Sequence, residues 1–160
     1  MILVVDSGST KTDWISLDKK GSIIFSTQTF GMNPQVLSSY IMSERIINNF
    51  DLYQNRDSFN KIFFYGAGCG VSSSRNRILK VFEGIFKKCD FEIKEDTYAA
   101  VHSTIKVGEK AIVCILGTGS NCCYYNGNDI EQKIASLGYT IMDEASGNFF
   151  WKGINKKLLF

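Results

Sequence analysis

The first seventeen residues read MILVVDSGSTKTDWISL, and their pattern shows how the central sheet begins. The β-branched apolar run at residues 2–5 is typical of a buried strand. Residues 6–10 are small and polar, which indicates a turn, and residues 12–17 alternate well enough to form a second strand. A Gly-terminated turn at 18–21 then leads into a third strand at 22–29. The sequence therefore predicts a sheet that begins with two consecutive hairpins.

Helical and strand patterns alternate in the residues that follow. We predict helices that start at Asn33-Pro34, at Ser73 or Ser74, and at Asp96, because Asn, Ser and Asp favour the N-cap and Pro favours the first helical position. Strands are predicted at 61–65 and 91–94. The apolar residues expected on the inward face of the first helix are Leu37, Tyr40, Ile41, Ile47 and Phe50. The order β-β-β-α-β-α-β-α indicates an α/β fold with a mixed sheet.

A similar pattern restarts near residue 110. Strands are predicted at 111–116, 121–125 and 130–136, with a hairpin turn at Asn126-Gly127 between the last two. A helix is predicted at 146–157. We therefore expect two domains, residues 1–108 and residues 109–160. The apolar end Leu158-Leu159-Phe160 suggests a truncated chain, because termini are normally polar.

Composition excludes several classes of protein. The 160 residues are 44% hydrophobic and 21% charged with a net charge of +2, which argues against nucleic acid or an anionic membrane as the main partner. No signal peptide or membrane span is visible, so we expect a cytoplasmic protein. The five cysteines are odd in number and irregularly spaced, which favours reduced thiols over disulfides or zinc. Of the vicinal pair Cys122-Cys123, one side chain should point inward and one outward.

Two turns rich in Gly, Ser and Thr follow predicted strands and could cradle phosphate groups through backbone N–H groups and hydroxyls. The alternative for each is a plain hairpin turn. The first does not fit a Walker A motif, because Thr10 rather than Gly precedes Lys11. Asp6, at a strand end, could hold a magnesium ion through water. The candidate phosphate-binding residues are Gly8, Ser9, Thr10, Lys11 and Thr12 in the first turn and Gly117, Thr118, Gly119 and Ser120 in the second.

Three motifs occur in order along the chain: DSGSTKTDW from residue 6, LGTGSN from residue 116, and LGYxxxDExSG from residue 137. Together they resemble the N-acetylglucosamine kinase family and the related BadF/BadG/BcrA/BcrD-type ATPases. These belong to the superfamily of actin, sugar kinases and heat-shock chaperones. The resemblance implies a ribonuclease-H-like fold in each lobe, with the first lobe complete and the second only begun.

The resemblance also implies ATP-dependent phosphorylation of an amino sugar, most similar to N-acetylglucosamine, with ATP and Mg²⁺ as cofactors. Asp96 matches the catalytic aspartate, which also contacts the sugar, and Asp6 lies near the metal. Four of the residues that match sugar-binding positions have a structural alternative: Asp96 and Asn33 as helix caps, and Asp143-Glu144 as the polar start of a helix. A homodimer is left open. The positions that match sugar-binding residues are Asn33, Asp96, Gly138, Asp143 and Glu144.

The chain departs from the family pattern in two respects. Met142 and Ala145 stand where relatives commonly have Gly, and Ala at a positive φ should shift the backbone. The chain is also shorter than the family kinases. Two other functions therefore remain open, namely an ATPase that activates a partner enzyme and a non-catalytic fragment that binds sugar or nucleotide.

Overall fold

The computed structural model describes residues 1–106, 108–116, 120–132 and 145–151. The chain divides into two compact units, Met1–Ala99 and Ala100–Phe160. The division falls within helix α4 (Thr97–Thr104), ahead of the boundary that we expected at residue 108. Each unit is described by itself.

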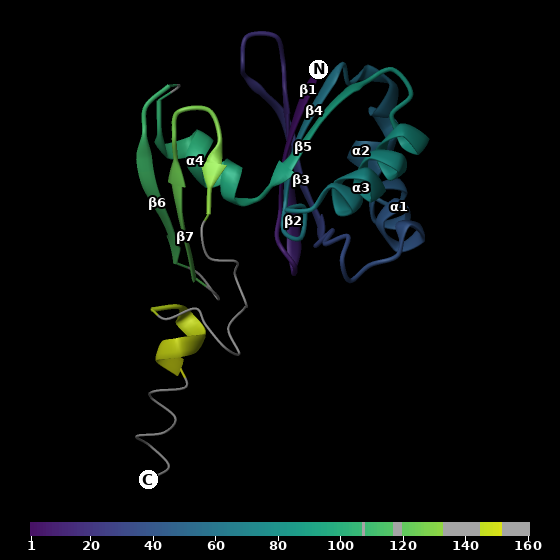
Figure 1. The fold of residues 1–160 in the computed structure, drawn as a ribbon. Helices are drawn as coiled ribbons and strands as arrows, with labels where there is room; N and C mark the ends of the chain where they lie inside the picture. The colour runs from purple at the N-terminus through teal and green to yellow at the C-terminus, as the bar shows by residue number, and fades with distance from the viewer. Residues whose placement is uncertain (107, 117–119, 133–144, 152–160) are drawn as a thin grey trace. The chain divides into compact units, whose positions relative to one another are not determined.

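A five-stranded mixed sheet forms the centre of the first unit (Figure 1). Its strands are β1 (Ile2–Ser7), β2 (Lys11–Leu17), β3 (Ile23–Phe30), β4 (Lys61–Gly66) and β5 (Asp90–Glu95), in the spatial order β3-β2-β1-β4-β5. Strands β3, β2 and β1 are antiparallel neighbours, whereas β1, β4 and β5 run parallel. The predicted hairpins and mixed sheet are confirmed.

Three helices, α1 (Ser39–Ile47), α2 (Phe50–Gln54) and α3 (Ser72–Ile85), lie on the same side of this sheet (Figure 1). Every second side chain of the strands points toward these helices, and the apolar ones on that face, such as Leu3, Val5 and Trp14, are fully buried. Phe82 of α3 packs at the centre of this core, with its ring centroid 5.3 Å from that of Phe64 and 6.2 Å from that of Trp14.

The predicted helix start at Asn33-Pro34 is wrong. The N–H groups of Val36 and Leu37 both donate to the Asn33 carbonyl, so residues 33–37 form a turn. Helix α1 begins only at Ser39, where the Ser38 hydroxyl accepts the Ile41 N–H at 3.3 Å.

The Arg77 side chain explains this late start. It donates to the carbonyls of Pro34 and Leu37, which a continuing helix would need for its own ladder. The inward face consequently differs from the predicted one: Met42 and Ile46 are the buried residues of α1, while Tyr40 is 70% exposed. The other predicted inward residues, Leu37, Ile41, Ile47 and Phe50, are half-buried or exposed.

Helix α3 begins at Ser72, earlier than predicted, and its N-cap residue Val71 makes no side-chain capping bond. The predicted caps Ser73 and Ser74 are therefore wrong. The sequence pattern from Ile78 to Phe86 places apolar residues on the inward side, and Ile78, Phe82, Ile85 and Phe86 are indeed buried.

The second unit contains a three-stranded antiparallel sheet, β6 (Ala111–Leu116), β7 (Ser120–Tyr125) and β8 (Ile130–Glu131). Its buried cluster comprises Val101, Val113, Cys123 and Tyr125. The predicted turn at Asn126-Gly127 is confirmed: the Asn126 side chain accepts the N–H groups of residues 128 and 129, and Gly127 adopts a φ of 102°.

Residues 147–151 are helical, and Ser146 caps them by accepting the Phe149 N–H at 3.2 Å. The predicted helix start at 146 is thus confirmed. Ala145 adopts a φ of 64°, so the backbone keeps the left-handed conformation that suits Gly. Within the described part of the chain, no helix is both long enough and apolar enough to span a membrane.

Candidate functional site

The carboxyl ends of three parallel strands meet at one edge of the first unit's sheet. Ser7, Gly66 and Glu95 are the last residues of β1, β4 and β5, and they are register partners across the sheet. Two bonds tie the following loops together: Ala67 N–H donates to the Ser7 carbonyl at 2.8 Å, and Asp96 N–H donates to the Gly66 carbonyl at 3.3 Å. This edge is where open α/β sheets bind their ligands.

The first predicted phosphate turn connects β1 to β2 at this edge. Gly8 N–H donates to the Lys11 carbonyl at 2.9 Å and closes the turn, so this amide is already used within the hairpin. Gly31 N–H donates to the Thr10 carbonyl at 2.8 Å. A Cβ on Gly31 would lie only 2.3 Å from the Ser9 carbonyl oxygen, so only glycine permits this close approach. Ser9 and Thr10 themselves are exposed.

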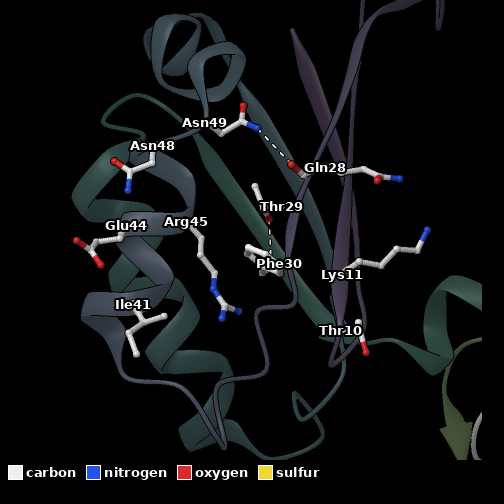
Figure 2. Close-up of a pocket in the computed structure, with 10 residues that line it drawn as sticks. All are labelled: Thr10, Lys11, Gln28, Thr29, Phe30, Ile41, Glu44, Arg45, Asn48 and Asn49. Carbon is white, nitrogen blue, oxygen red and sulfur yellow. Dashed lines mark hydrogen bonds between the residues drawn. The ribbon is translucent and has the colours of Figure 1, made fainter.

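A pocket of about 680 Å³ opens between β3 and α1 beside the same turn (Figure 2). Phe30 is 74% exposed, and the Arg45 guanidinium carbon lies 5.6 Å from the centre of its ring. Asp6, Asn33 and Asp96 do not line this pocket, so it is separate from the carboxylates at the sheet edge. The lining residues are Thr10, Lys11, Gln28, Thr29, Phe30, Ile41, Glu44, Arg45, Asn48 and Asn49.

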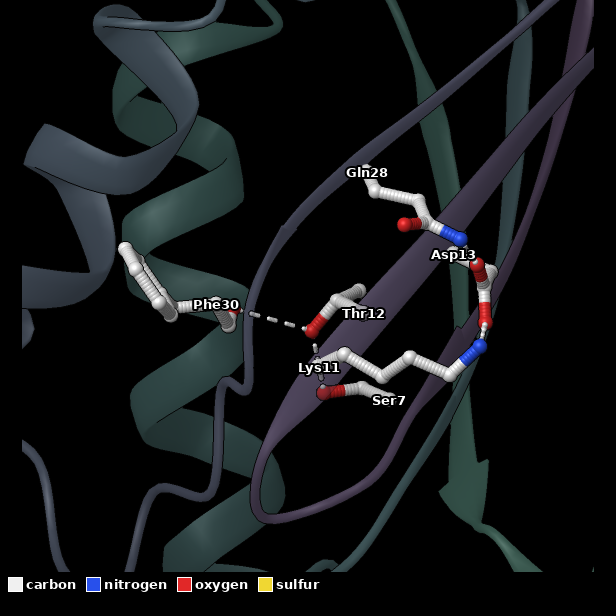
Figure 3. Close-up of polar contacts among 6 residues, drawn as sticks. All are labelled: Ser7, Lys11, Thr12, Asp13, Gln28 and Phe30. Carbon is white, nitrogen blue, oxygen red and sulfur yellow. Dashed lines mark hydrogen bonds and ion pairs between the residues drawn. The ribbon is translucent and has the colours of Figure 1, made fainter.

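Two buried hydroxyls support the turn from the helical side of the sheet (Figure 3). Ser7 Oγ and Thr12 Oγ1 lie 2.8 Å apart, and Thr12 Oγ1 donates to the Phe30 carbonyl at 3.2 Å. Ser7 Oγ also accepts the Met32 N–H at 3.1 Å. Thr12 was predicted to bind phosphate, but its hydroxyl is fully buried and engaged here, so in this structure its side chain holds the turn to the segment after β3.

Lys11 points along the opposite face of the sheet (Figure 3). Its ammonium group lies 2.9 Å from a carboxylate oxygen of Asp13, whose other oxygen accepts a bond from Gln28 at 2.5 Å. The Lys11 ammonium holds the pKa of Asp13 below its usual range, and Asp13 in turn raises the pKa of Lys11. A phosphate would therefore compete with Asp13 for this cation.

Asp6 and Asp96 influence each other electrostatically at the sheet edge. Asp96 directly precedes α4, and its carboxylate accepts the N–H of Thr97, the first residue of that helix, at 3.1 Å. Burial raises the pKa of Asp96, and the charge of Asp6 raises it further. The pKa of Asp6 is also raised, by desolvation first and then by Asp13, its register partner on β2.

Asn33 lies against the glycine loop that follows β4. Gly68 adopts a φ of 79°, and a Cβ there would come within 2.2 Å of the Asn33 side-chain oxygen. That oxygen accepts the Gln35 N–H at 2.9 Å, so Asn33 caps a turn rather than a helix. The structure thus brings the Asn33 side chain against Gly68 of the loop that follows β4.

Three arginines that the sequence analysis missed hold these loops in place. Arg45 donates to the Gly31 carbonyl, and Arg77 donates to the carbonyls of Pro34 and Leu37. Arg75 donates to the carbonyls of Cys69 and Gly70, both at 2.8 Å. The basic residues at 75 and 77 near the start of α3 were the available signal, but a lone Arg on a helix usually faces solvent.

Several solved structures with known names are similar to this chain in overall fold. A protein from Porphyromonas gingivalis, provisionally named an N-acetylglucosamine kinase, is 32% identical over 99% of this chain, with a TM-score of 0.86. A second provisionally named N-acetylglucosamine kinase, from Chromobacterium violaceum, is 19% identical over 97% of the chain, with a TM-score of 0.65. MreB5 of Spiroplasma citri, solved with ADP bound, is 12% identical over 98%, with a TM-score of 0.61.

This chain has the actin and sugar-kinase ATPase fold. The resemblance to the N-acetylglucosamine kinases that the three motifs indicated is confirmed. The chain spans 56% of the Porphyromonas protein and 55% of the Chromobacterium protein. No protein-family profile matches the sequence, and no curated protein matches it closely.

Part of the predicted kinase site lies outside the described residues. These positions are Gly117, Thr118 and Gly119 of the second phosphate turn, and Gly138, Asp143 and Glu144 of the predicted sugar-closing segment. Ser120, the last residue of the second turn, begins β7. Apart from Ser120, the predicted site residues that the structure describes all belong to the first unit: the first predicted phosphate turn, Asn33, Asp6 and Asp96.

Proposed function

We propose that this chain carries the phosphate-binding and sugar-binding part of an ATP-dependent sugar kinase that acts on an amino sugar, with N-acetylglucosamine as the first candidate. The observation that supports the proposal most is the meeting of Asp6, the first predicted phosphate turn and Asp96 at the carboxyl ends of β1 and β5. The names of the two similar proteins from Porphyromonas and Chromobacterium support N-acetylglucosamine as the first candidate substrate.

Asp96 is the proposed catalytic base. Phosphoryl transfer to an alcohol requires a group that holds the hydroxyl and accepts its proton. The raised pKa of the Asp96 carboxyl makes it a stronger base than an ordinary exposed aspartate. Its bond from the Thr97 N–H holds one carboxylate oxygen at the start of α4. The other oxygen is the one proposed to accept the proton of the sugar hydroxyl.

The exposed residues of the first turn are proposed to bind the nucleotide phosphates. Ser9 and Thr10 offer hydroxyls, and the side chain of Lys11 is 64% exposed and can leave Asp13 for a stronger anion. The ADP bound to the distant structural relative MreB5 supports nucleotide binding by this fold.

The donor set at the sheet edge fits magnesium. No group of three or more metal-ligating side chains occurs in the described part of the chain. Mg²⁺ nevertheless needs only one or two carboxylates, because water and substrate phosphates complete its shell. Asp6 would hold the ion and Asp96 lies close enough for their charges to interact. The ion would neutralise phosphate charge, and it would also relieve the repulsion between the two carboxylates.

Sugar-dependent release of ADP from magnesium-ATP tests the proposal. We expect Asp96→Asn to lower turnover about 10²–10⁴-fold, because Asn keeps the capping oxygen but cannot accept the proton. Asp90→Asn is the matched control, since this exposed aspartate begins β5 at the opposite end of the strand. An unchanged rate in Asp96→Asn would overturn the catalytic role.

The pH profile provides a second readout. Asp96 must be ionised to act, and its pKa is raised above 3.8, so kcat/KM should fall at a higher pH than for an unperturbed aspartate as the solution is acidified. ATP hydrolysis at the same rate with and without the sugar would instead favour an ATPase that activates a partner enzyme. Nucleotide or sugar binding without turnover would favour the non-catalytic alternative.

A further inference from the structure

Cys114 of β6 and Cys122 of β7 face each other across the second unit's sheet. They are register partners, and the hydrogen-bonded Sγ atoms of Cys114 and Cys122 lie 3.5 Å apart. Directly paired residues of antiparallel strands have Cα atoms about 4.5–5.5 Å apart, which lies within the roughly 4.4–6.8 Å that a disulfide spans. We propose that these two residues form a reversible cross-strand disulfide when the chain meets a peroxide.

Exposure selects this pair among the five cysteines. Both Cys114 and Cys122 are exposed. Burial raises the pKa of Cys69 to about 12 and that of Cys89 to about 11, so few thiolates form at either residue near neutral pH. Cys123 is only 4% exposed and packs in the unit's buried cluster. The prediction that the vicinal pair points to opposite faces is confirmed, with Cys122 outward and Cys123 inward.

The same alternation disfavours a bond between the vicinal residues. A link between Cys122 and Cys123 would have to turn one of the two side chains through the sheet, with loss of the strand around them. A link between Cys114 and Cys122 requires only that two sulfurs already in contact approach to about 2 Å. Both strands keep their pairing, because residues 114 and 122 are already opposite each other.

The chemistry balances with hydrogen peroxide as the oxidant. One thiolate attacks a peroxide oxygen, which gives a sulfenic acid and releases hydroxide. The second thiolate attacks that sulfur, the S–S bond forms and another hydroxide leaves. With the two thiol protons the products are one disulfide and two waters, and the two electrons lost by sulfur reduce the peroxide. The neighbouring Cys114 thiol raises the pKa of Cys122, so the reaction should accelerate as pH rises.

The disulfide would enclose residues 115–121, which include the predicted phosphate residues Gly117 to Ser120. The proposed disulfide would therefore flank, in the sequence, a turn that is predicted to bind phosphate. The inference itself stands on the thiol geometry of β6 and β7 and does not depend on the proposed kinase activity.

Peptide mapping of the peroxide-treated chain tests the inference. After treatment, the chain is denatured in acid, its thiols are blocked with N-ethylmaleimide, and it is digested with trypsin. Residues 111–133 form one tryptic peptide that contains Cys114, Cys122 and Cys123. We expect this peptide to be lighter by two hydrogens and to carry a single maleimide, located at Cys123 by fragmentation. Dithiothreitol should restore three modifiable thiols.

Single serine variants distinguish the possible partners. Cys123→Ser should still close the bond, whereas Cys114→Ser and Cys122→Ser, both at exposed positions, should not. A maleimide on Cys114 after oxidation would show a vicinal bond and overturn the proposal. Three maleimide-blocked thiols in the treated chain, as in the untreated chain, would also overturn the proposal. A treated peptide that carries sulfinic acid but has not lost two hydrogens would overturn it as well.

Discussion

The two units bury their apolar residues in very different ways. The first unit packs a sheet face against helices through a chain of aromatic contacts that joins Trp14, Phe64, Phe82 and Phe86. The described part of the second unit buries a small cluster around Val113 and Tyr125. Its strand β6 also leaves Ile112 72% exposed and Leu116 68% exposed.

This difference places the larger core in the unit that also carries Asp6 and Asp96, the two proposed catalytic-site carboxylates. Burial of apolar area is the main favourable term in folding, so the first unit should supply most of the free energy of unfolding. The same core fixes the strand ends that carry Asp6 and Asp96, which a catalytic site needs for precise positioning. The second unit carries the exposed cysteine pair on a sheet with less packing behind it.

The substitution Phe82→Ala should have the largest effect. Phe82 is fully buried and contacts four other rings, so we expect a loss of about 3–5 kcal/mol in the free energy of unfolding. Hydrogen exchange followed by mass spectrometry should show β1, β2 and β4 losing protection while β6 and β7 keep theirs.

Phe30→Ala provides the control, because this ring is 74% exposed and its removal should change stability little. Equal loss of protection in both units after Phe82→Ala would mean that the two units unfold together, and the separate stability of the first unit would then be refuted.

Arg77→Met should have the next largest effect. It removes the guanidinium that binds the Pro34 and Leu37 carbonyls, and bonds to charged donors contribute about 1.5–3 kcal/mol. The midpoint of urea unfolding should fall accordingly. Arg56→Met is the matched control, because Arg56 makes an exposed bond to the Tyr53 carbonyl. Equal shifts in the two variants would refute a special role for Arg77 in holding the segment after β3.

Arg77 also shows where prediction from the sequence stops. The strands, the turn residues and the α/β class follow from local patterns, because period-2 burial and the chemistry of small residues act over a few positions. The start of α1 depends instead on a side chain on α3 that captures two carbonyls far away in the sequence. Likewise, the buried Thr12 hydroxyl is indistinguishable from a phosphate ligand until its bond to the Phe30 carbonyl is seen. Asp96, by contrast, could be placed at a helix start from its neighbours alone.

Ala145→Gly should have the smallest effect, and it should be a gain. Ala145 adopts a φ of 64°, which costs a non-glycine residue about 1–2 kcal/mol. Gly removes this strain, but its greater freedom in the unfolded chain reduces the gain in stability by about 0.4–1 kcal/mol. The Phe149 and Phe150 amides, which both donate to Ser146, should therefore exchange more slowly in Ala145→Gly. Ala99→Gly, within α4, is the opposite-sign control, because Gly inside a helix costs roughly 0.5–1 kcal/mol. Faster exchange at both amides in Ala145→Gly would mean that the methyl group of Ala145 contributes more to this segment through contacts than it costs in backbone strain.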